Sequence, residues 1–272
     1  FLEDYVEGYP MFEKRDSVAI INPDEVQRIL VFGDLHGDLY SLQRGLELRH
    51  SDDLVVFLGD YADRGPSGVE IIEGIQELKS RIPDKVIALM GNHEDYTEYG
   101  EPTFTPCTLI DEAVRKRGSW DEFFPVFKEF TNQLFLSALM PGYVMFVHGG
   151  INSTIQSEED LALPGPALRR ELLWNDPYPE EGEYASMRGA GSMFGPDVSK
   201  KVLEQLNVRF LIRSHEPRKA LQGPWIEHEG RVITTSATRI YDGRPFVLLL
   251  EPHNSSWDSF ADSPVFLDNN TH

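Results

Sequence analysis

The chain has 272 residues, 40% of them hydrophobic and 11% aromatic, and a formal net charge of -20 at pH 7. This composition predicts a soluble globular protein, because no apolar run approaches the roughly 18 residues that a membrane-spanning helix needs. The excess of acidic residues also disfavours nucleic acid as a partner, since DNA and RNA phosphates are bound by clustered Lys and Arg.

Four short apolar runs in the first part of the chain are predicted to be buried strands. They cover residues 28–33, 53–59, 85–90 and 143–147. Apolar residues recur at helical spacing after the first two runs, over 39–48 and 69–78. Strands that alternate with helices predict an α/β fold, in which functional groups lie on loops at the carboxyl edge of the sheet.

The remaining segments are expected to be a helical region, loops and a second set of strands. Residues 108–139 are predicted to be mostly helical, with an aromatic face that belongs to the core. That face comprises Trp120, Phe123, Phe124, Phe127 and Phe130. Stretches 164–166 and 176–191, rich in Pro, Glu and Gly, are expected to be exposed loops that frame the site. A helix over 198–206 and strands over 209–213, 231–235 and 246–250 complete the predicted elements.

Five short segments combine acids, histidines or asparagine with glycines or turn residues. They are 33–37, 59–65, 91–94, 148–150 and 213–216. Asp and His are ligands that manganese, iron and zinc accept, and a neighbouring Gly lets the backbone turn close to an ion. One such segment is weak support, but five in order predict a two-metal phosphoesterase site.

A two-metal site needs one ligand that bridges ions about 3.5 to 4 Å apart, and a carboxylate is suited to this role. Asp60 is the predicted bridge. The first ion would be held by Asp34, His36 and Asp60, and the second by Asp60, Asn92, His148 and His215. A hydroxide bridging the two ions would attack phosphorus directly. We expect two divalent ions, with manganese suitable in vitro and iron or zinc as alternatives.

Four further residues are expected to act on the phosphate or the leaving group. His93 is the predicted acid that protonates the leaving oxygen, and Asp63 would orient it. Arg64 is the expected phosphate clamp, and Arg188, in a glycine-rich loop, is a second one. Glu94 and Glu216, which follow proposed histidines, are expected to orient backbone or ligands.

These residues, in this order, resemble the phosphoprotein phosphatases, the metal-dependent Ser/Thr family that includes calcineurin. The resemblance runs from about residue 29 to residue 241 and includes the stretches 172–177, 193–198 and 212–216. It implies a calcineurin-like metallophosphoesterase fold, with a central β-sandwich flanked by helices and a dimetal site on loops at the strand ends. It also implies the roles given above for the metal ligands, for His93 as the acid and for the arginines that bind phosphate. It strengthens the assignment of Arg188.

The chain departs from the family pattern at two places. Met90 stands where the family usually has Arg, and 236–241 replaces the family's Ser-Ala-Pro-Asn-Tyr stretch. We expect Arg239 to add positive charge near the phosphate and Tyr241 to be displaced from the position that covers the metals. The hypothesis is a broadened specificity that includes phosphotyrosine. The candidate substrate-binding residues are Arg64, Asn92, Arg188, Arg239 and Tyr241.

The favoured interpretation is a protein phosphatase that hydrolyses phosphoserine and phosphothreonine in protein or peptide substrates. One alternative is a diadenosine tetraphosphatase or another small-molecule phosphoesterase. The resemblance of residues 174–177 and 195–197 to the phosphoprotein phosphatases argues against it. Another is a scaffold of the same fold without catalysis, which the intact ligand set opposes.

The sequence predicts a single metallophosphoesterase domain over 1–272. An N-terminal extension to about residue 27 and a loosely ordered tail over about 255–272 are expected at its ends. Cys107 is the sole cysteine, so an internal disulfide and a thiolate metal site are excluded, and we expect a cytoplasmic location.

Overall fold

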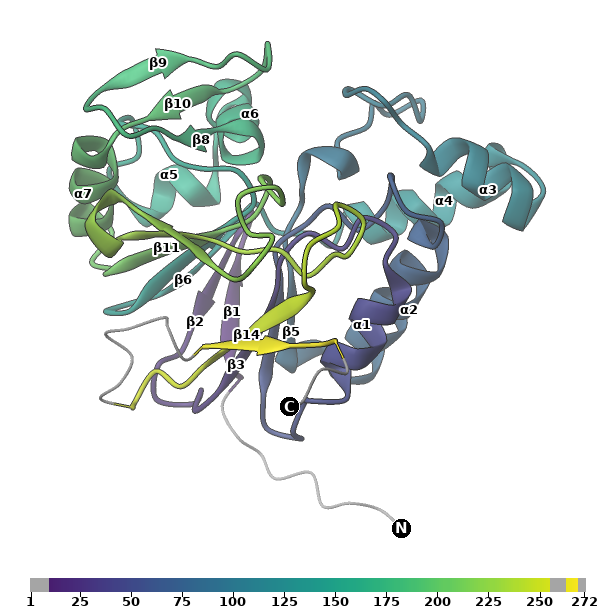
Figure 1. Cartoon of the computed structure of the whole chain (residues 1–272), viewed down its shortest axis with the longest axis horizontal. Helices are drawn as coiled ribbons and strands as arrows, with labels where there is room; N and C mark the ends of the chain where they lie inside the picture. The colour runs from purple at the N-terminus through teal and green to yellow at the C-terminus, as the bar shows by residue number, and fades with distance from the viewer. Residues whose placement is uncertain (1–9, 255–262, 269–272) are drawn as a thin grey trace.

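The computed structural model describes residues 10–254 and 263–268. Two sheets lie face to face at the centre, with helices on the outer face of each (Figure 1). In the five-stranded sheet the order is β15 (Pro264–Phe266), β14 (Phe246–Leu250), β3 (Ile29–Phe32), β4 (Leu54–Phe57) and β5 (Val86–Ala88). In the seven-stranded sheet it is β1 (Phe12–Arg15), β2 (Val18–Ile21), β6 (Ser137–Met140), β7 (Val144–Val147), β11 (Phe210–Arg213), β13 (Val232–Thr234) and β12 (Trp225–Glu227).

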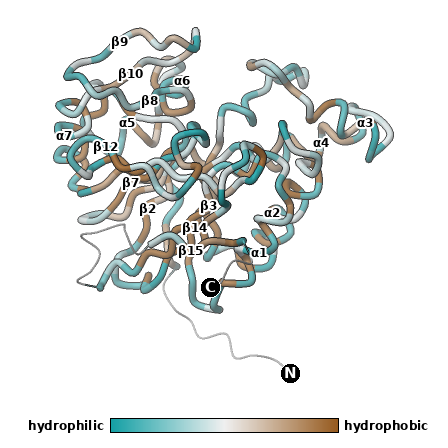
Figure 2. The backbone as a smooth tube through the Cα atoms, in the orientation of Figure 1, coloured by the Kyte–Doolittle hydropathy of each residue, from teal (hydrophilic) through white to brown (hydrophobic). Residues whose placement is uncertain are grey.

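The two-residue period of the strands explains this layering. In β3, Ile29 and Val31 face the other sheet and join the core between the sheets, where Phe146 and Ile212 meet them. Leu30 and Phe32 point the other way, into the core beneath the helices. Strands buried on both faces need apolar residues at every position, and Figure 2 shows hydrophobic residues concentrated along the central strands.

The helices form two groups, one on each outer face. Those beside the five-stranded sheet are α1 (Leu39–Leu46), α2 (Gly68–Arg81), α3 (Leu109–Arg117) and α4 (Trp120–Thr131). Those beside the seven-stranded sheet are α5 (Glu158–Ala162), α6 (Pro166–Trp174) and α7 (Pro196–Gln205). A small sheet of β8 (Asp176–Pro177), β10 (Ser192–Phe194) and β9 (Glu183–Ala185) lies next to α6. Short 3-10 helices occupy Pro83–Lys85, Asn92–Glu94 and His228–Gly230.

The structure confirms most of the predicted strands and the predicted fold, and it corrects three segments. The helical region expected over 108–139 breaks at Gly118, whose φ is 91°, and ends at Thr131, after which β6 begins at Ser137. The expected loop over 176–191 contains β8 and β9. In the predicted loose tail, residues 264–266 form β15, which pairs with β14. The other parts of that tail, 255–262 and 269–272, lie outside the described residues.

Two strands lie within the segment expected to be an N-terminal extension. β1 pairs with β2, and β2 pairs with β6, so both belong to the seven-stranded sheet. The predicted aromatic face is buried at Phe123, Phe127 and Phe130. Among the described residues, no helix has the length and apolar character required to cross a membrane.

Candidate active site

The candidate metal ligands all follow the carboxyl ends of strands. Asp34 and His36 follow β3, Asp60 follows β4, Asn92 and His93 follow β5, His148 follows β7 and His215 follows β11. β3, β4 and β5 are parallel, as are β7 and β11, so each set of loops leaves its sheet at one edge. A bridge between Asp34 and Ser236 joins the two edges. The fold thereby collects side chains that are far apart in the sequence.

The loops adopt a backbone that is unusual for residues other than glycine. His36, Asp60 and His215 have φ values of 44°, 54° and 69°, in the left-handed region. Gly59 has a φ of 103°, and a Cβ at this position would lie 2.5 Å from the amide nitrogen of Gly91. Positive φ in residues with side chains is costly and tends to occur at functional sites, where the surrounding structure holds it in place.

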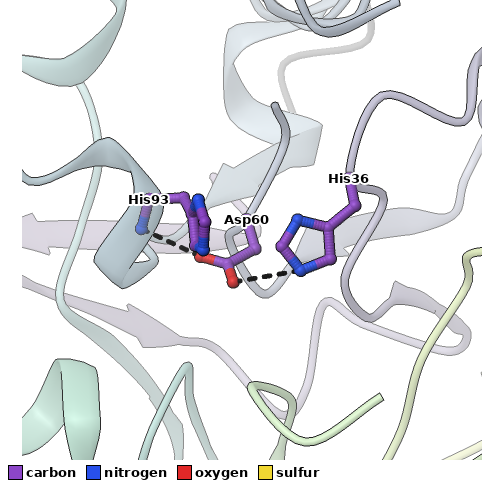
Figure 3. A group of neighbouring side chains, drawn as sticks. All are labelled: His36, Asp60 and His93. Atoms are coloured by element: carbon purple, nitrogen blue, oxygen red, sulfur yellow. Dashed lines mark hydrogen bonds and ion pairs between the residues drawn. The ribbon is translucent and has the colours of Figure 1, made fainter. Parts of the chain in front are cut away.

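One group of potential ligands centres on Asp60 (Figure 3). The Nε2 atom of His36 lies 3.5 Å from Oδ2 of Asp60, and the backbone N–H of His93 donates to Oδ1 at 3.1 Å. His36, Asp60 and His93 each offer a ligand atom within 4.8 Å of the others. Asp34, which was predicted for this ion, is not in that compact group.

A second group, which shares Asp60, contains the later histidines. Nε2 of His148 lies 3.3 Å from Oδ1 of Asp60, 3.0 Å from Oδ1 of Asn92 and 3.1 Å from Nδ1 of His215. Nδ1 of His148 donates to the carbonyl of Leu58 at 2.9 Å, which leaves a lone pair on Nε2. The structure thus brings together all four ligands that were predicted for the second ion.

Two buried atoms at the site have no hydrogen-bond partner among the described residues, and this shows that the residues fit a cation. They are Oδ2 of Asp34 and Nε2 of His215. The other oxygen of Asp34 accepts from the hydroxyl of Ser214 and the backbone N–H of His215. Buried polar atoms are rarely left without partners, and carboxylate oxygen and imidazole nitrogen suit intermediate divalent metals.

Burial controls the protonation of the site. It raises the pKa of Asp60 well above its usual value, and the charge of Asp34 raises it further. The pKa of Asp34 is raised to about 6, also by burial. Burial lowers the pKa of His36 to about 3 and that of His148 and His215 well below the usual value. The histidines are therefore neutral, which is the form that binds metal, while bound cations would offset the crowded carboxylates.

Glu94 ties two of the loops together. Its carboxylate accepts from the backbone N–H groups of Asp60, Tyr61 and Gly91 at 2.8, 3.0 and 2.9 Å. The expectation that Glu94 orients the backbone is confirmed. Burial raises its pKa to about 7 despite these hydrogen bonds. It fixes the loop that carries Asp60 against the loop that carries Asn92.

His93 and Asp63 form the predicted pair. Nδ1 of His93 lies 2.7 Å from Oδ2 of Asp63, and the other Asp63 oxygen accepts from the backbone of Thr108 and Leu109 at the start of α3. Burial raises the pKa of Asp63, but the hydrogen bonds from His93 and the backbone outweigh it and leave the pKa lowered. Burial lowers the pKa of His93 against the opposing effect of Asp63. Phe104, which the sequence did not indicate, packs against His93 with the ring centroids 4.3 Å apart and the rings tilted by 49°.

A cavity of about 610 Å³ opens above these residues. Of the predicted site residues, it is lined by His36, Asp60, Arg64, Asn92, His93, Arg188, His215 and Tyr241. Asp34, Asp63, His148 and Arg239 are not among its lining residues. We refer to this cavity as the groove. Its buried base includes four of the candidate ligands, His36, Asp60, Asn92 and His215, and its rim is formed by exposed arginines.

Arg188 lies at the rim, where the carboxylates of Asp176 and Glu216 contact its guanidinium. Its Nε donates to Asp176 at 2.6 Å, and its Nη2 lies 3.8 Å from Glu216. The side chain is 41% exposed. Arg213, which is fully buried, also donates to Asp176 at 3.0 Å. These contacts orient the guanidinium of Arg188 beside the groove.

The structure contradicts both expectations for the 236–241 segment. Arg239 donates to Asp38 through Nε at 3.0 Å and Nη2 at 2.8 Å, and its guanidinium lies 4.1 Å from the ring centre of Tyr40. Its charge is thus neutralised outside the groove. Tyr241 is not displaced from the site, because its ring lies edge-on to His36 with centroids 5.6 Å apart. The Arg239–Asp38 pair joins positions far apart in the sequence. The periodicity of apolar residues along the chain does not reveal such a pair.

Arg169 contacts Met90, the residue that stands where the family usually has Arg. Its Nη2 lies 3.1 Å from the sulfur of Met90 and 2.7 Å from a carboxylate oxygen of Asp95. An arginine from α6 therefore reaches the loop that carries Asn92 and His93. Sequence reasoning missed Arg169, because no local pattern links α6 to that loop.

Comparisons with known proteins show the family and the fold of the chain. Residues 27–219 match the family model described as calcineurin-like phosphoesterase. Serine/threonine-protein phosphatase 5 of Arabidopsis thaliana is 33% identical over 236 residues, which are 83% of this chain and 42% of that protein. The Homo sapiens protein of the same name is 32% identical over 228 residues, 80% of this chain and 44% of that protein. The chain thus spans less than half the length of these relatives.

Solved structures give the same fold. A protein serine/threonine phosphatase from Saccharomyces cerevisiae has a TM-score of 0.74 at 26% identity, covering 88% of this chain and 78% of that one. A cold-active protein-tyrosine phosphatase of a Shewanella psychrophile has a TM-score of 0.58 at 16% identity, covering 95% and 84%. At that identity the second likeness shows the fold alone.

Proposed function

The chain belongs to the calcineurin-like phosphoesterases, and we propose that it is a metal-dependent protein phosphatase acting on phosphoserine and phosphothreonine. The observation that carries the proposal is the position of Asp60 in two groups of potential ligands, beside the His93–Asp63 pair and open to the groove. The relatives named serine/threonine-protein phosphatase support the same activity. A cytoplasmic location remains part of the proposal.

The proposed metal ligands are Asp34, His36, Asp60, Asn92, His148 and His215. The unpartnered atoms of Asp34 and His215 support this set. When bound, two divalent ions supply positive charge that lowers the pKa of water and stabilises charge developing on the phosphoryl group. Manganese, iron and zinc all suit a site of carboxylate, amide and imidazole ligands.

Arg64 and Arg188 would bind the phosphoryl oxygens at the rim of the groove. A guanidinium matches two phosphate oxygens with paired hydrogen bonds. Arg64 has no carboxylate partner among the described residues, and its side chain is in hydrogen-bond contact with Tyr241, which also lines the groove. Arg188 is oriented by Asp176 and still leaves Nη atoms for the substrate.

His93 would donate the proton that the leaving alkoxide needs. The bond from Nδ1 to Asp63 fixes the orientation of the ring and leaves Nε2 as the atom that transfers the proton. Asp63 itself is held by the backbone of Thr108 and Leu109, so it remains ionised and favours the protonated form of His93. These residues account for binding, orientation and proton transfer.

The proposal is tested with metal-stripped protein reconstituted with manganese. Phosphate release is measured from matched phosphoserine, phosphothreonine and phosphotyrosine peptides, with diadenosine tetraphosphate assayed in parallel. Turnover of the phosphoserine and phosphothreonine peptides is the expected result, and phosphotyrosine turnover would extend the specificity. Cleavage of the dinucleotide alone would replace the proposal with a small-molecule phosphoesterase, and no turnover with two ions bound would favour a scaffold.

A further inference from the structure

Three arginines at the rim of the groove have no carboxylate partner among the described residues. They are Arg64, Arg170 and Arg218. Nη2 of Arg170 donates weakly to the carbonyl of Gly189 at 3.3 Å, and the guanidinium of Arg218 lies 5.4 Å from the ring centre of Tyr241. Both side chains belong to exposed residues. Unpaired positive charge gathers here although the whole chain carries a net charge of -20.

The carboxylates closest in sequence to Arg170 and Arg218 are engaged elsewhere. Glu216 accepts from Arg213 at 2.6 Å and lies 3.1 Å from Lys219. Glu171 accepts from the side chain of Asn152 and from the hydroxyl of Ser192. The positive charge of the rim is therefore available to an incoming anion.

The groove extends beyond the candidate metal ligands at Arg170. A second depression of about 320 Å³ shares Arg170, Gly189 and Ala190 with the groove. Arg170 lies on α6, which Figure 1 places beside the β8–β10 sheet and across the molecule from α3 and α4. A ligand longer than a single phosphorylated side chain that extends into this second depression would pass Arg170.

We propose that Arg170 and Arg218 bind a second anionic group on a polypeptide substrate whose phosphorylated residue occupies the candidate active site. The inference rests on the proposed function and deepens it by naming the substrate class, an acidic phosphopeptide. Arg64 and Arg188 serve the reacting phosphate, so Arg170 and Arg218 remain for a neighbouring group. That group is a carboxylate or a second phosphate, either of which a guanidinium binds through charge-assisted hydrogen bonds.

The test compares three phosphoserine peptides of equal length. One has neutral flanking residues, one has Glu on both sides, and one has Glu replaced by further phosphoserine. The kcat/KM ratio of each acidic peptide to the neutral peptide is measured for the wild type, Arg170→Glu, Arg218→Glu and the double variant. The matched control is Arg115→Glu, which has the same charge change at an exposed position of α3 outside the groove.

The wild type should favour the acidic peptides by about tenfold, and each rim variant should reduce that ratio about three- to tenfold, since charge pairs at exposed sites are modest in strength. The Arg115→Glu variant should keep the wild-type ratio. A preference shared by both acidic peptides indicates a general anion site, whereas a preference for the peptide with flanking phosphoserines alone indicates a phosphate site. Raising the salt concentration should reduce the preference, because exposed charges are screened.

A binding measurement separates recognition from catalysis. The affinity of each variant is measured for acidic and neutral peptides that carry a non-hydrolysable phosphonate. The rim variants should lose affinity for the acidic peptide and keep their affinity for the neutral one. Circular dichroism melting should show that the rim variants remain folded. Equal kcat/KM for acidic and neutral peptides in the wild type overturns the inference while leaving the proposed function intact. A ratio that falls equally in Arg115→Glu also overturns it. No turnover of any peptide overturns the proposed function together with this inference.

Discussion

The base and the rim of the groove are built in opposite ways. At the base, His36, Asp60 and Asn92 are at most 2% exposed, and backbone or side-chain contacts from neighbouring loops hold them. At the rim, Arg170 and Arg218 are exposed and lack carboxylate partners among the described residues. The fold therefore fixes the side chains of the base, whereas the arginines of the rim remain exposed to solvent and to an incoming ligand.

The energetic reason lies in solvation. A buried carboxylate is costly unless it is paired, hydrogen-bonded or bound to a cation, so each substitution at the base affects several neighbours. An exposed arginine keeps its hydration, and its replacement leaves the fold unchanged. We therefore expect base variants to change metal content, rate or stability, and rim variants to change substrate affinity.

The largest effect is expected for Asp60→Asn. This change removes a charge shared by both groups of ligands, so metal content should fall for both ions and kcat/KM should drop at least about a thousandfold. Elemental analysis and phosphate release measure the two effects. Asp84→Asn, at an exposed position, is the control. Full metal content in Asp60→Asn would contradict the role of a shared ligand.

His93→Ala should separate proton transfer from metal binding. Because Nδ1 of His93 is bonded to Asp63, we expect metal content near that of the wild type and a kcat lowered about a hundred- to ten-thousandfold. The geometry offers a competing role, since His93 also belongs to the group with His36 and Asp60. Loss of one ion from the variant would show that His93 is a ligand rather than the acid.

Arg188→Ala tests the part of the rim that adjoins the base. Loss of a charge-assisted hydrogen bond of about 1.5 to 3 kcal/mol should weaken inhibition by free phosphate about ten- to a hundredfold. Metal content should stay unchanged, because Arg188 contacts Asp176 and Glu216 rather than a proposed ligand. Arg115→Ala is the matched control. Unchanged phosphate inhibition would remove Arg188 from the phosphate site.

Glu94→Gln should have the smallest effect of the four, on stability. The amide replaces one acceptor oxygen with a donor that faces a backbone N–H, which should cost about 1 to 3 kcal/mol in the free energy of unfolding. Denaturant unfolding measures the change, with the exposed Glu101→Gln as control. Equal stability of the two variants would show that Glu94 does not hold the loops together.

Much of the fold and of the candidate site could be predicted because the signals are local. The apolar run before Asp34 and the one before Asp60 correspond to β3 and β4, and the polar residues after them lie at the sheet edge as expected. The pairing of His93 with Asp63 was also predicted and is present at 2.7 Å. The small strands β8 and β9 were missed, because two or three residues give too short a pattern to identify.

Local sequence patterns suffice to identify the residues with metal-ligand chemistry and the strands that precede them, because strand period, glycine and ligand type act over a few neighbouring residues. Tertiary packing sets how charges are paired across the chain. It joined Arg239 to Asp38 outside the groove and Arg188 to Asp176 at the rim, and it left Arg170 and Arg218 without carboxylate partners among the described residues. The reason is that the energy of a charge depends on its surroundings in space, which arise when distant segments pack together.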